Sequence, residues 1–219
     1  MNKIKLILSV LLLILLGSLQ SSDAVEIETG DEVPDFTLSA VGGGLMKLSD
    51  YREKLVVLIY WRTEQERSLV TIEEVKAIQE RYGEKGLEVI SIVAGTEDME
   101  AVKKVTKERA VGFPILKDTG RNIYGTYGIR VYPTTLIIDR EGKLNKVIPG
   151  HAVTYQQRLE SQIRHILGEI DDVQMHKALE PKKEEKGDAE LEAELKYNLA
   201  LKFTESRLFD QAIEAAQGA

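Results

Sequence analysis

One continuous apolar run and a second, mostly apolar segment dominate the middle of the chain and predict the central strands of a sheet. Residues 55–61 read Leu-Val-Val-Leu-Ile-Tyr-Trp and residues 87–93 read Leu-Glu-Val-Ile-Ser-Ile-Val. Runs rich in β-branched residues are typical of strands buried on both faces. Between them, apolar residues recur mostly at three- and four-residue intervals from 70 to 82, which predicts a helix that Gly83 and Gly86 end.

The same alternation of strand and helix patterns continues toward the C-terminus. The further expected elements are a helix with apolar positions at 99, 102, 105 and 110, a strand over 113–116, a short helix over 122–129, a strand over 133–139, a turn at 140–143, a returning strand over 144–148 and an amphipathic helix over 155–167. This order predicts an α/β sandwich, in which a mixed central sheet carries helices on both faces.

The first 24 residues have the pattern of a secretory signal peptide. Lys3 and Lys5 precede an eleven-residue segment from Leu6 to Leu16 that is apolar except for Ser9, and Ser22-Asp23-Ala24 forms a small-x-small cleavage site. An uncleaved membrane anchor is the alternative, but the run is shorter than the roughly 20 residues that span a bilayer. We therefore expect export to the periplasm or another extracytoplasmic space, with no stable membrane span after the signal is removed.

The pattern changes again after the predicted domain, which covers residues 25–168. Residues 169–188 are highly charged without apolar periodicity, and we expect a linker there. Residues 189–219 regain a helical period and predict a helical hairpin. Its apolar stripe needs a cover, either the preceding domain or another chain, and is a candidate partner surface. The candidate residues are Leu199, Phe203 and Phe209.

The composition argues against several classes of function. The formal net charge is −7, and no basic block or zinc-finger spacing occurs, so nucleic acid is a poor candidate for a partner. Three scattered histidines and no cysteines make no metal-binding constellation, and we expect neither a metal nor a cofactor. A chain without cysteine cannot carry out thiol chemistry of its own.

Three separated motifs carry a resemblance to a known family. They are Val33-Pro34-Asp35-Phe36-Thr37-Leu38, the strand that ends in Tyr60-Trp61, and the segment from Tyr132-Pro133-Thr134 to Gly142-Lys143. In this order and spacing they resemble the exported thioredoxin-like proteins of the TlpA/ResA and AhpC/TSA redoxin group, over about residues 27–168. The C-terminal hairpin partly resembles a tetratricopeptide repeat, with a generic helical hairpin as the alternative.

The resemblance implies where a thiol site would lie. In the family, the strand that ends at Trp61 is followed by Cys-x-x-Cys at the start of a helix, where the helix N-terminus lowers the pKa of the first thiol. On this sequence the two cysteine positions are Gln65 and Ser68, so we expect no catalytic residue. Pro133 matches the family's proline that follows a cis peptide bond.

A peptide groove could persist beside Pro133 although the thiols are absent. Its candidate residues are Trp61, Tyr132, Pro133 and Thr134; alternatively, Pro133 only maintains the fold. The favoured function is a redox-inactive binding or scaffold module of the cell envelope, whose partner is another envelope protein or a peptide. The alternative is a thiol–disulfide oxidoreductase or a peroxidase, as the resemblance implies. A holdase would use the same groove for a broader set of partners.

Overall fold

The chain divides into two compact units, with the boundary between Leu179 and Glu180. The computed structural model describes residues 27–180, 188–206 and 208–217, so the predicted signal peptide lies outside the described residues. Among the described residues, no helix is both long enough and apolar enough to cross a membrane.

Strands and helices alternate along the first unit, as the apolar pattern predicts. In chain order the elements are β1 (Thr37–Ala40), β2 (Leu45–Lys47), the 3-10 helix η1 (Leu48–Tyr51), β3 (Leu55–Trp61), α2 (Glu66–Tyr82), the 3-10 helix η2 (Gly83–Lys85), β4 (Leu87–Ala94), α3 (Met99–Glu108), β5 (Ile115–Asp118), α4 (Asn122–Thr126), β6 (Thr134–Ile138), β7 (Leu144–Pro149), α5 (Tyr155–Ile166) and α6 (Asp172–Leu179).

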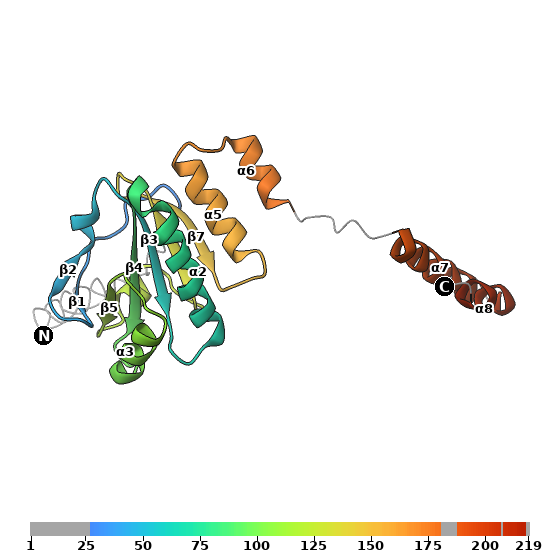
Figure 1. The fold of residues 1–219 in the computed structure, drawn as a ribbon, viewed down its shortest axis with the longest axis horizontal. Helices are drawn as coiled ribbons and strands as arrows, with labels where there is room; N and C mark the ends of the chain where they lie inside the picture. The colour runs from blue at the N-terminus through green and yellow to red at the C-terminus, as the bar shows by residue number, and fades with distance from the viewer. Residues whose placement is uncertain (1–26, 181–187, 207, 218–219) are drawn as a thin grey trace, which may run out of the picture. The chain divides into compact units, whose positions relative to one another are not determined.

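The strands form one mixed sheet in the order β2-β1-β5-β4-β3-β6-β7 (Figure 1). Strand β4 pairs in parallel with both β3 and β5, whereas β6 runs antiparallel to β3 and β7 antiparallel to β6. The two long apolar runs of the sequence are therefore neighbours at the centre of the sheet, where both of their faces are covered. The mixed α/β sandwich predicted from the sequence is confirmed.

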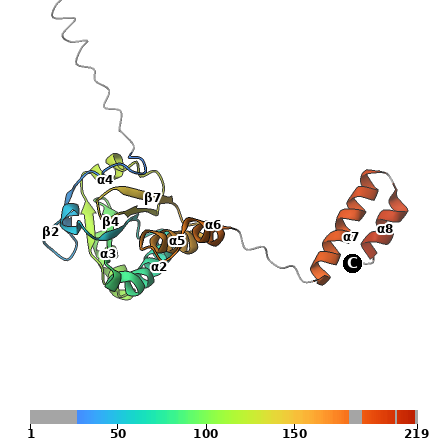
Figure 2. The same cartoon turned by 90° about the horizontal axis from the view of Figure 1, so that it is seen from above.

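Alternate residues of β3 enter two separate apolar clusters, one on each face of the sheet. Leu55, Val57, Ile59 and Trp61 pack with residues of α2, α3 and α5. Val56, Leu58 and Tyr60 pack with residues of η1, α4 and the segment that precedes β1. Figure 2 shows α4 on one side of the sheet and α2, α3 and α5 on the other. Trp61 and Tyr60, adjacent in sequence, thus belong to opposite layers.

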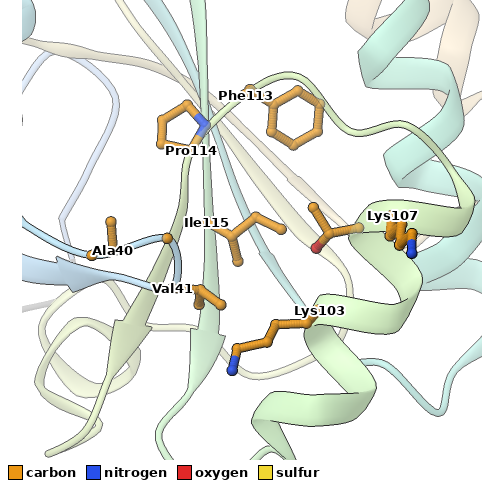
Figure 3. Close-up of a pocket in the computed structure, with 10 residues that line it drawn as sticks. Ala40, Val41, Lys103, Lys107, Phe113, Pro114 and Ile115 are labelled. Carbon is orange, nitrogen blue, oxygen red and sulfur yellow. The ribbon is translucent and has the colours of Figure 1, made fainter.

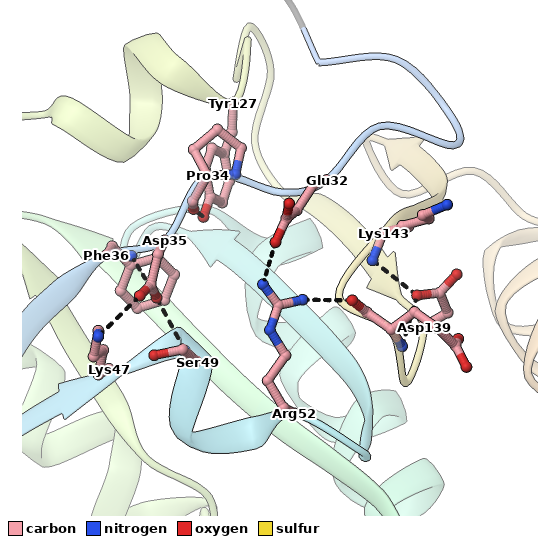
Figure 4. Close-up of polar contacts among 11 residues, drawn as sticks. Glu32, Pro34, Asp35, Phe36, Lys47, Ser49, Arg52, Tyr127, Asp139 and Lys143 are labelled. Carbon is pink, nitrogen blue, oxygen red and sulfur yellow. Dashed lines mark hydrogen bonds and ion pairs between the residues drawn. The ribbon is translucent and has the colours of Figure 1, made fainter.

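Polar contacts hold the Val33–Leu38 motif against neighbouring elements (Figure 4). The Asp35 carboxylate accepts a hydrogen bond from the Ser49 N–H at 2.9 Å and lies 3.3 Å from the Lys47 ammonium. The Tyr127 hydroxyl donates to the carbonyl oxygen of Pro34. The contact to Tyr127 places the motif against the end of α4, on the layer that also contains Tyr60.

Helix α6 corrects the predicted linker over 169–188. Residues 172–179 are helical and belong to the first unit, and the Gln157 side chain of α5 donates a hydrogen bond to the Ala178 carbonyl oxygen. The helix begins with reciprocal bonds: the Asp171 carboxylate accepts from the Gln174 N–H at 2.7 Å, and the Gln174 side chain accepts from the Asp171 N–H at 3.0 Å. This capping box starts a helix without a strong apolar period.

The second unit is a pair of helices, α7 (Asp188–Glu205) and α8 (Phe209–Gln217), that contact each other. The chain reverses between them, where the Leu208 N–H donates to the Phe203 carbonyl oxygen at 2.8 Å. A helical hairpin was expected here from the sequence. Its likeness to a tetratricopeptide repeat stays a prediction.

Candidate functional site

Gln65 and Ser68, where the resemblance implies the family's cysteines, lie at the start of α2. Gln65 is the N-cap residue, with an extended backbone (φ −107°, ψ 117°), and the Ser68 N–H donates to its carbonyl oxygen at 2.9 Å. Gln65 is half-buried, whereas Ser68 is fully buried. The Ser68 hydroxyl accepts a hydrogen bond from the Arg62 N–H at 3.3 Å. The amide side chain of Gln65 and the hydroxyl of Ser68 thus both lie at the first turn of α2.

A serine hydroxyl becomes a nucleophile when a base such as histidine accepts its proton, and two of the three histidines pair with carboxylates instead. The ring of His151 lies 2.8 Å from the Glu74 carboxylate, and the ring of His165 lies 2.8 Å from that of Asp172. Neither ring therefore points its paired nitrogen at Ser68. Among the described residues, no group of three or more acidic, histidine or cysteine side chains could hold a metal ion.

A buried carboxylate holds the loop between β3 and α2. Glu97, in the turn after β4, has a side chain only 4% exposed. It accepts hydrogen bonds from the Thr63 N–H at 3.1 Å, the Thr63 hydroxyl at 2.7 Å and the Arg62 Nε at 2.9 Å. Burial alone would raise the pKa of Glu97, but the hydrogen bonds from Thr63 and Arg62 outweigh it and hold the pKa below its ordinary value. The carboxylate therefore stays ionised and fixes the loop.

The loop before β6 supplies the second part of the site. The Tyr132–Pro133 peptide bond is cis, as the family resemblance implies. Pro133 is buried, and its carbonyl oxygen accepts from the Gly150 N–H at 2.7 Å. The Thr134 hydroxyl is also buried and donates to the Val131 carbonyl oxygen at 2.7 Å. These contacts leave Tyr132 as the half-buried side chain at this turn.

Three tyrosines pack together beside the turn. The rings of Tyr124 and Tyr132 are stacked, with centroids 6.0 Å apart and planes 27° apart, and the Tyr60 ring lies 5.8 Å from that of Tyr132 and 6.0 Å from that of Tyr124. Tyr60 is fully buried and donates its hydroxyl to the Asp118 carboxylate at 3.1 Å. Burial and then the Asp118 charge raise the pKa of Tyr60, so its hydroxyl remains a donor. Tyr60 anchors the two outer rings to the sheet.

Two arginines lie over the outer rings. The guanidinium carbon of Arg62 is 5.5 Å from the Tyr132 ring centroid, and that of Arg121 is 4.0 Å from the Tyr124 ring centroid. Both distances are within the range of cation–π attraction. Arg62 lies in the loop before α2, so its contact with Tyr132 joins the two parts of the site. We call Arg62, Arg121, Tyr124 and Tyr132 the Arg–Tyr platform.

The structure changes the set of groove candidates. Trp61 is fully buried among residues of α2, α3 and α5, so its side chain offers no surface to a partner. Pro133 and Thr134 are buried too, and Tyr132 is the one of the four with exposed side-chain surface. Sequence reasoning missed Arg62, Glu97, Tyr124 and Arg121. The tyrosines that cluster near the Tyr132-Pro133 motif were a weak signal for Tyr124. No signal in the sequence indicated the contacts of the two arginines.

A cleft of about 550 Å³ lies elsewhere in the first unit, between α3 and the end of β1 (Figure 3). Lys103 and Lys107 of α3 line it together with the apolar side chains of Phe113 and Ile115. Its lining includes none of the residues at the start of α2 or in the Tyr132–Pro133 turn. The cleft is therefore separate from the site described above.

The hairpin residues predicted as a partner surface are largely exposed. Leu199 is 45% exposed and Phe209 57% exposed, while Phe203 is half-buried. Leu199 and Phe203 line a shallow hollow with residues of α8. The hairpin alone therefore leaves much of its apolar stripe uncovered.

The sheet, the helix capped by Gln65 and the cis-Pro133 turn together define a thioredoxin-like protein without thiols. A solved structure from Chlorobium tepidum, a candidate thiol:disulfide interchange protein DsbE, superposes with a TM-score of 0.61 at 26% identity, covering 65% of this chain and all of that one. Residues 29–147 match the model of the AhpC/TSA family, and the chain belongs to this family.

Relatives in sequence include two proteins named thiol-disulfide oxidoreductase ResA. That of Geobacillus thermodenitrificans is 32% identical over 165 residues, which cover 70% of this chain and 92% of the relative. That of Bacillus thuringiensis is 29% identical over 174 residues, which cover 76% of this chain and 99% of the relative. The present chain has no cysteine with which to perform the exchange that these names describe.

Proposed function

We propose that the protein is a redox-inactive thioredoxin-fold module that binds an extended polypeptide across the start of α2 and the Tyr132–Pro133 turn. The observation that carries the proposal is that the helix start and the cis-proline turn are present, although the chain has no cysteine for redox chemistry. Gln65 caps α2, Ser68 is buried and hydrogen-bonded, and the Tyr132–Pro133 bond is cis. Thiol–disulfide exchange requires a thiolate that attacks a sulfur atom, and the chain contains no cysteine.

The contacts around Arg62 favour a binding role for this site over the alternative that the site only maintains the fold. Its N–H bonds Ser68, its Nε bonds buried Glu97, and its guanidinium lies over Tyr132. A fixed loop loses little conformational entropy when a partner binds, which favours affinity. Tyrosine and arginine are also the residue types enriched where proteins bind one another.

The proposal places this module in the cell envelope, with another envelope protein or peptide as its partner. The charged start, the apolar run and the small-x-small site of residues 1–24 support export, and so does the resemblance to exported redoxins. The hairpin of α7 and α8 would add a second partner surface, because its apolar residues remain exposed.

Two measurements on the purified protein test the proposed function. Insulin reduction should not exceed the buffer rate, while a cysteine-containing ResA relative gives turnover. A fluorescein-labelled, unstructured peptide should bind, and Tyr132→Ala should weaken its binding while Leu45→Ala, which removes an exposed side chain on β2, should not. Reproducible insulin reduction would favour the oxidoreductase alternative. Binding of many unrelated peptides with similar affinity would favour the holdase.

A further inference from the structure

The Arg–Tyr platform presents positive charge over aromatic rings at the edge of the proposed peptide site. A guanidinium above a ring uses its face for the cation–π contact, so its N–H groups remain available at its edge. That edge matches a carboxylate, which it binds with two parallel hydrogen bonds. Arg121 and the Arg62 side chain are both exposed enough to meet a ligand.

The nearby acidic groups leave N–H donors of the two guanidiniums available, although the charge of Glu97 offsets that of Arg62. Glu97 pairs with Arg62 through Nε at 2.9 Å, which leaves the terminal guanidinium nitrogens for another partner. Asp118 accepts hydrogen bonds from the Tyr60 hydroxyl and from the N–H groups of Asn122 and Tyr124. These donors satisfy the buried Asp118 carboxylate without Arg121.

Arg121, whose guanidinium lies over the Tyr124 ring, has an uncommon backbone conformation. Its φ of 54° lies in the left-handed region, where residues other than glycine are uncommon, and it is the N-cap residue of α4. Residues held in such a conformation tend to occur at ligand sites. The residue in this conformation is the one whose guanidinium lies 4.0 Å from the Tyr124 ring centroid.

We infer that the extended partner segment is acidic, and that Arg62 and Arg121 bind its carboxylates beside the Tyr132–Pro133 turn. This inference rests on the proposed function. Long-range electrostatics works against it, since the chain has a net charge of −7 and Glu64 is exposed in the same loop as Arg62. At physiological ionic strength, screening beyond about 8 Å reduces that repulsion. The short-range contacts of the two guanidiniums with the peptide carboxylates then determine the preference for an acidic segment.

The test compares fluorescein-labelled peptides of one extended sequence that differ only in carrying Glu, Gln or Lys at the same positions. Their dissociation constants are measured by fluorescence anisotropy at physiological salt. The Glu peptide should bind about tenfold more tightly than the Gln peptide, as one added charged contact allows. Arg121→Gln should remove most of that advantage, measured as the ratio of the variant's dissociation constants for the Gln and Glu peptides. Lys104→Gln, on the exposed surface of α3, is the matched control and should change neither affinity.

The outcomes separate this inference from the proposed function. Equal affinities for the Glu and Gln peptides, or tightest binding of the Lys peptide, would overturn the acidic preference while peptide binding stands. An undiminished preference in Arg121→Gln would also overturn it, because the charge would then be recognised elsewhere. If none of the peptides binds, the proposed function fails and this inference fails with it.

Discussion

The guanidinium carbon of Arg62 lies 5.5 Å from the ring centroid of Tyr132, and this contact bridges the two loops of the site. One loop leads into α2 at the positions where the family has its cysteines; the other contains the cis-Pro133 turn. Because Arg62 also bonds Ser68 and Glu97, the bridge is tied to the helix start and to the turn after β4. Contacts of Arg62 thus join the two loops of the site and the turn after β4, although the site has no thiols.

Glu97→Gln should lower the stability of the first unit at neutral pH. The change weakens hydrogen bonds from Thr63 and Arg62 to a buried carboxylate, and bonds to charged groups contribute on the order of 2 kcal/mol. Urea unfolding, followed by circular dichroism, measures the loss. Glu100→Gln, at an exposed ion pair on α3, is the matched control and should leave the free energy of unfolding unchanged.

The stability difference between the wild type and Glu97→Gln should also depend on pH. The pKa of Glu97 is lowered in the folded state, so its contribution is complete above its ordinary pKa of 4.5 and is lost as the pH falls through the lowered folded value. The difference between the two proteins should therefore shrink on acidification. A difference that grew below the ordinary pKa would show that folding raises the pKa of Glu97.

Gln65→Cys combined with Ser68→Cys should form an intramolecular disulfide under mild oxidation. The two residues occupy the N-cap and third positions of α2, which is the spacing of Cys-x-x-Cys at a helix start. Thiol titration and mass spectrometry of the oxidised monomer measure the product. Gln65→Cys alone is the control and should retain a free thiol as a monomer. Disulfides that form only between chains would show that these are not the family's cysteine positions.

The fold could be predicted from the sequence because its signals are local. The apolar runs of β3 and β4 identify two central strands, and the Tyr132-Pro133 motif fixes the start of β6. Most of the site could not be predicted, since it depends on contacts between distant residues. Arg62 and Glu97 are 35 positions apart, and no pattern in the sequence pairs them.

Burial also could not be read from residue type alone. Trp61 is the last residue of β3 and belongs to a motif, which favoured it as a groove residue, yet its side chain lies on the layer of α2, α3 and α5. Helix α6 was missed for a different reason: its apolar period is weak. The sequence Asp171-Asp172-Val173-Gln174 nevertheless has the spacing of a capping box and could have revealed its start.

Phe203→Ala combined with Phe209→Ala should weaken binding of a partner or self-association without changing the melting temperature of the first unit. Both residues belong to the separate unit of α7 and α8, and Phe209 is 57% exposed. Light scattering and calorimetry measure the two effects. Leu159→Ala, in the core of the first unit, is the contrasting variant and should cost about 2–5 kcal/mol. A large destabilisation by the double change would mean that the hairpin completes the core of the first unit.

Amide chemical-shift mapping during titration with the neutral Gln peptide is the most direct test of the central claim, that the cysteine-less site still binds polypeptide. The account predicts that the largest shifts occur at residues 62–68 and at Val131, Tyr132 and Thr134, and that Tyr132→Ala reduces them at both loops. Shifts confined to α7 and α8, or to the cleft beside Lys103, would contradict the claim, because the peptide would then bind away from the site where the family carries its thiols.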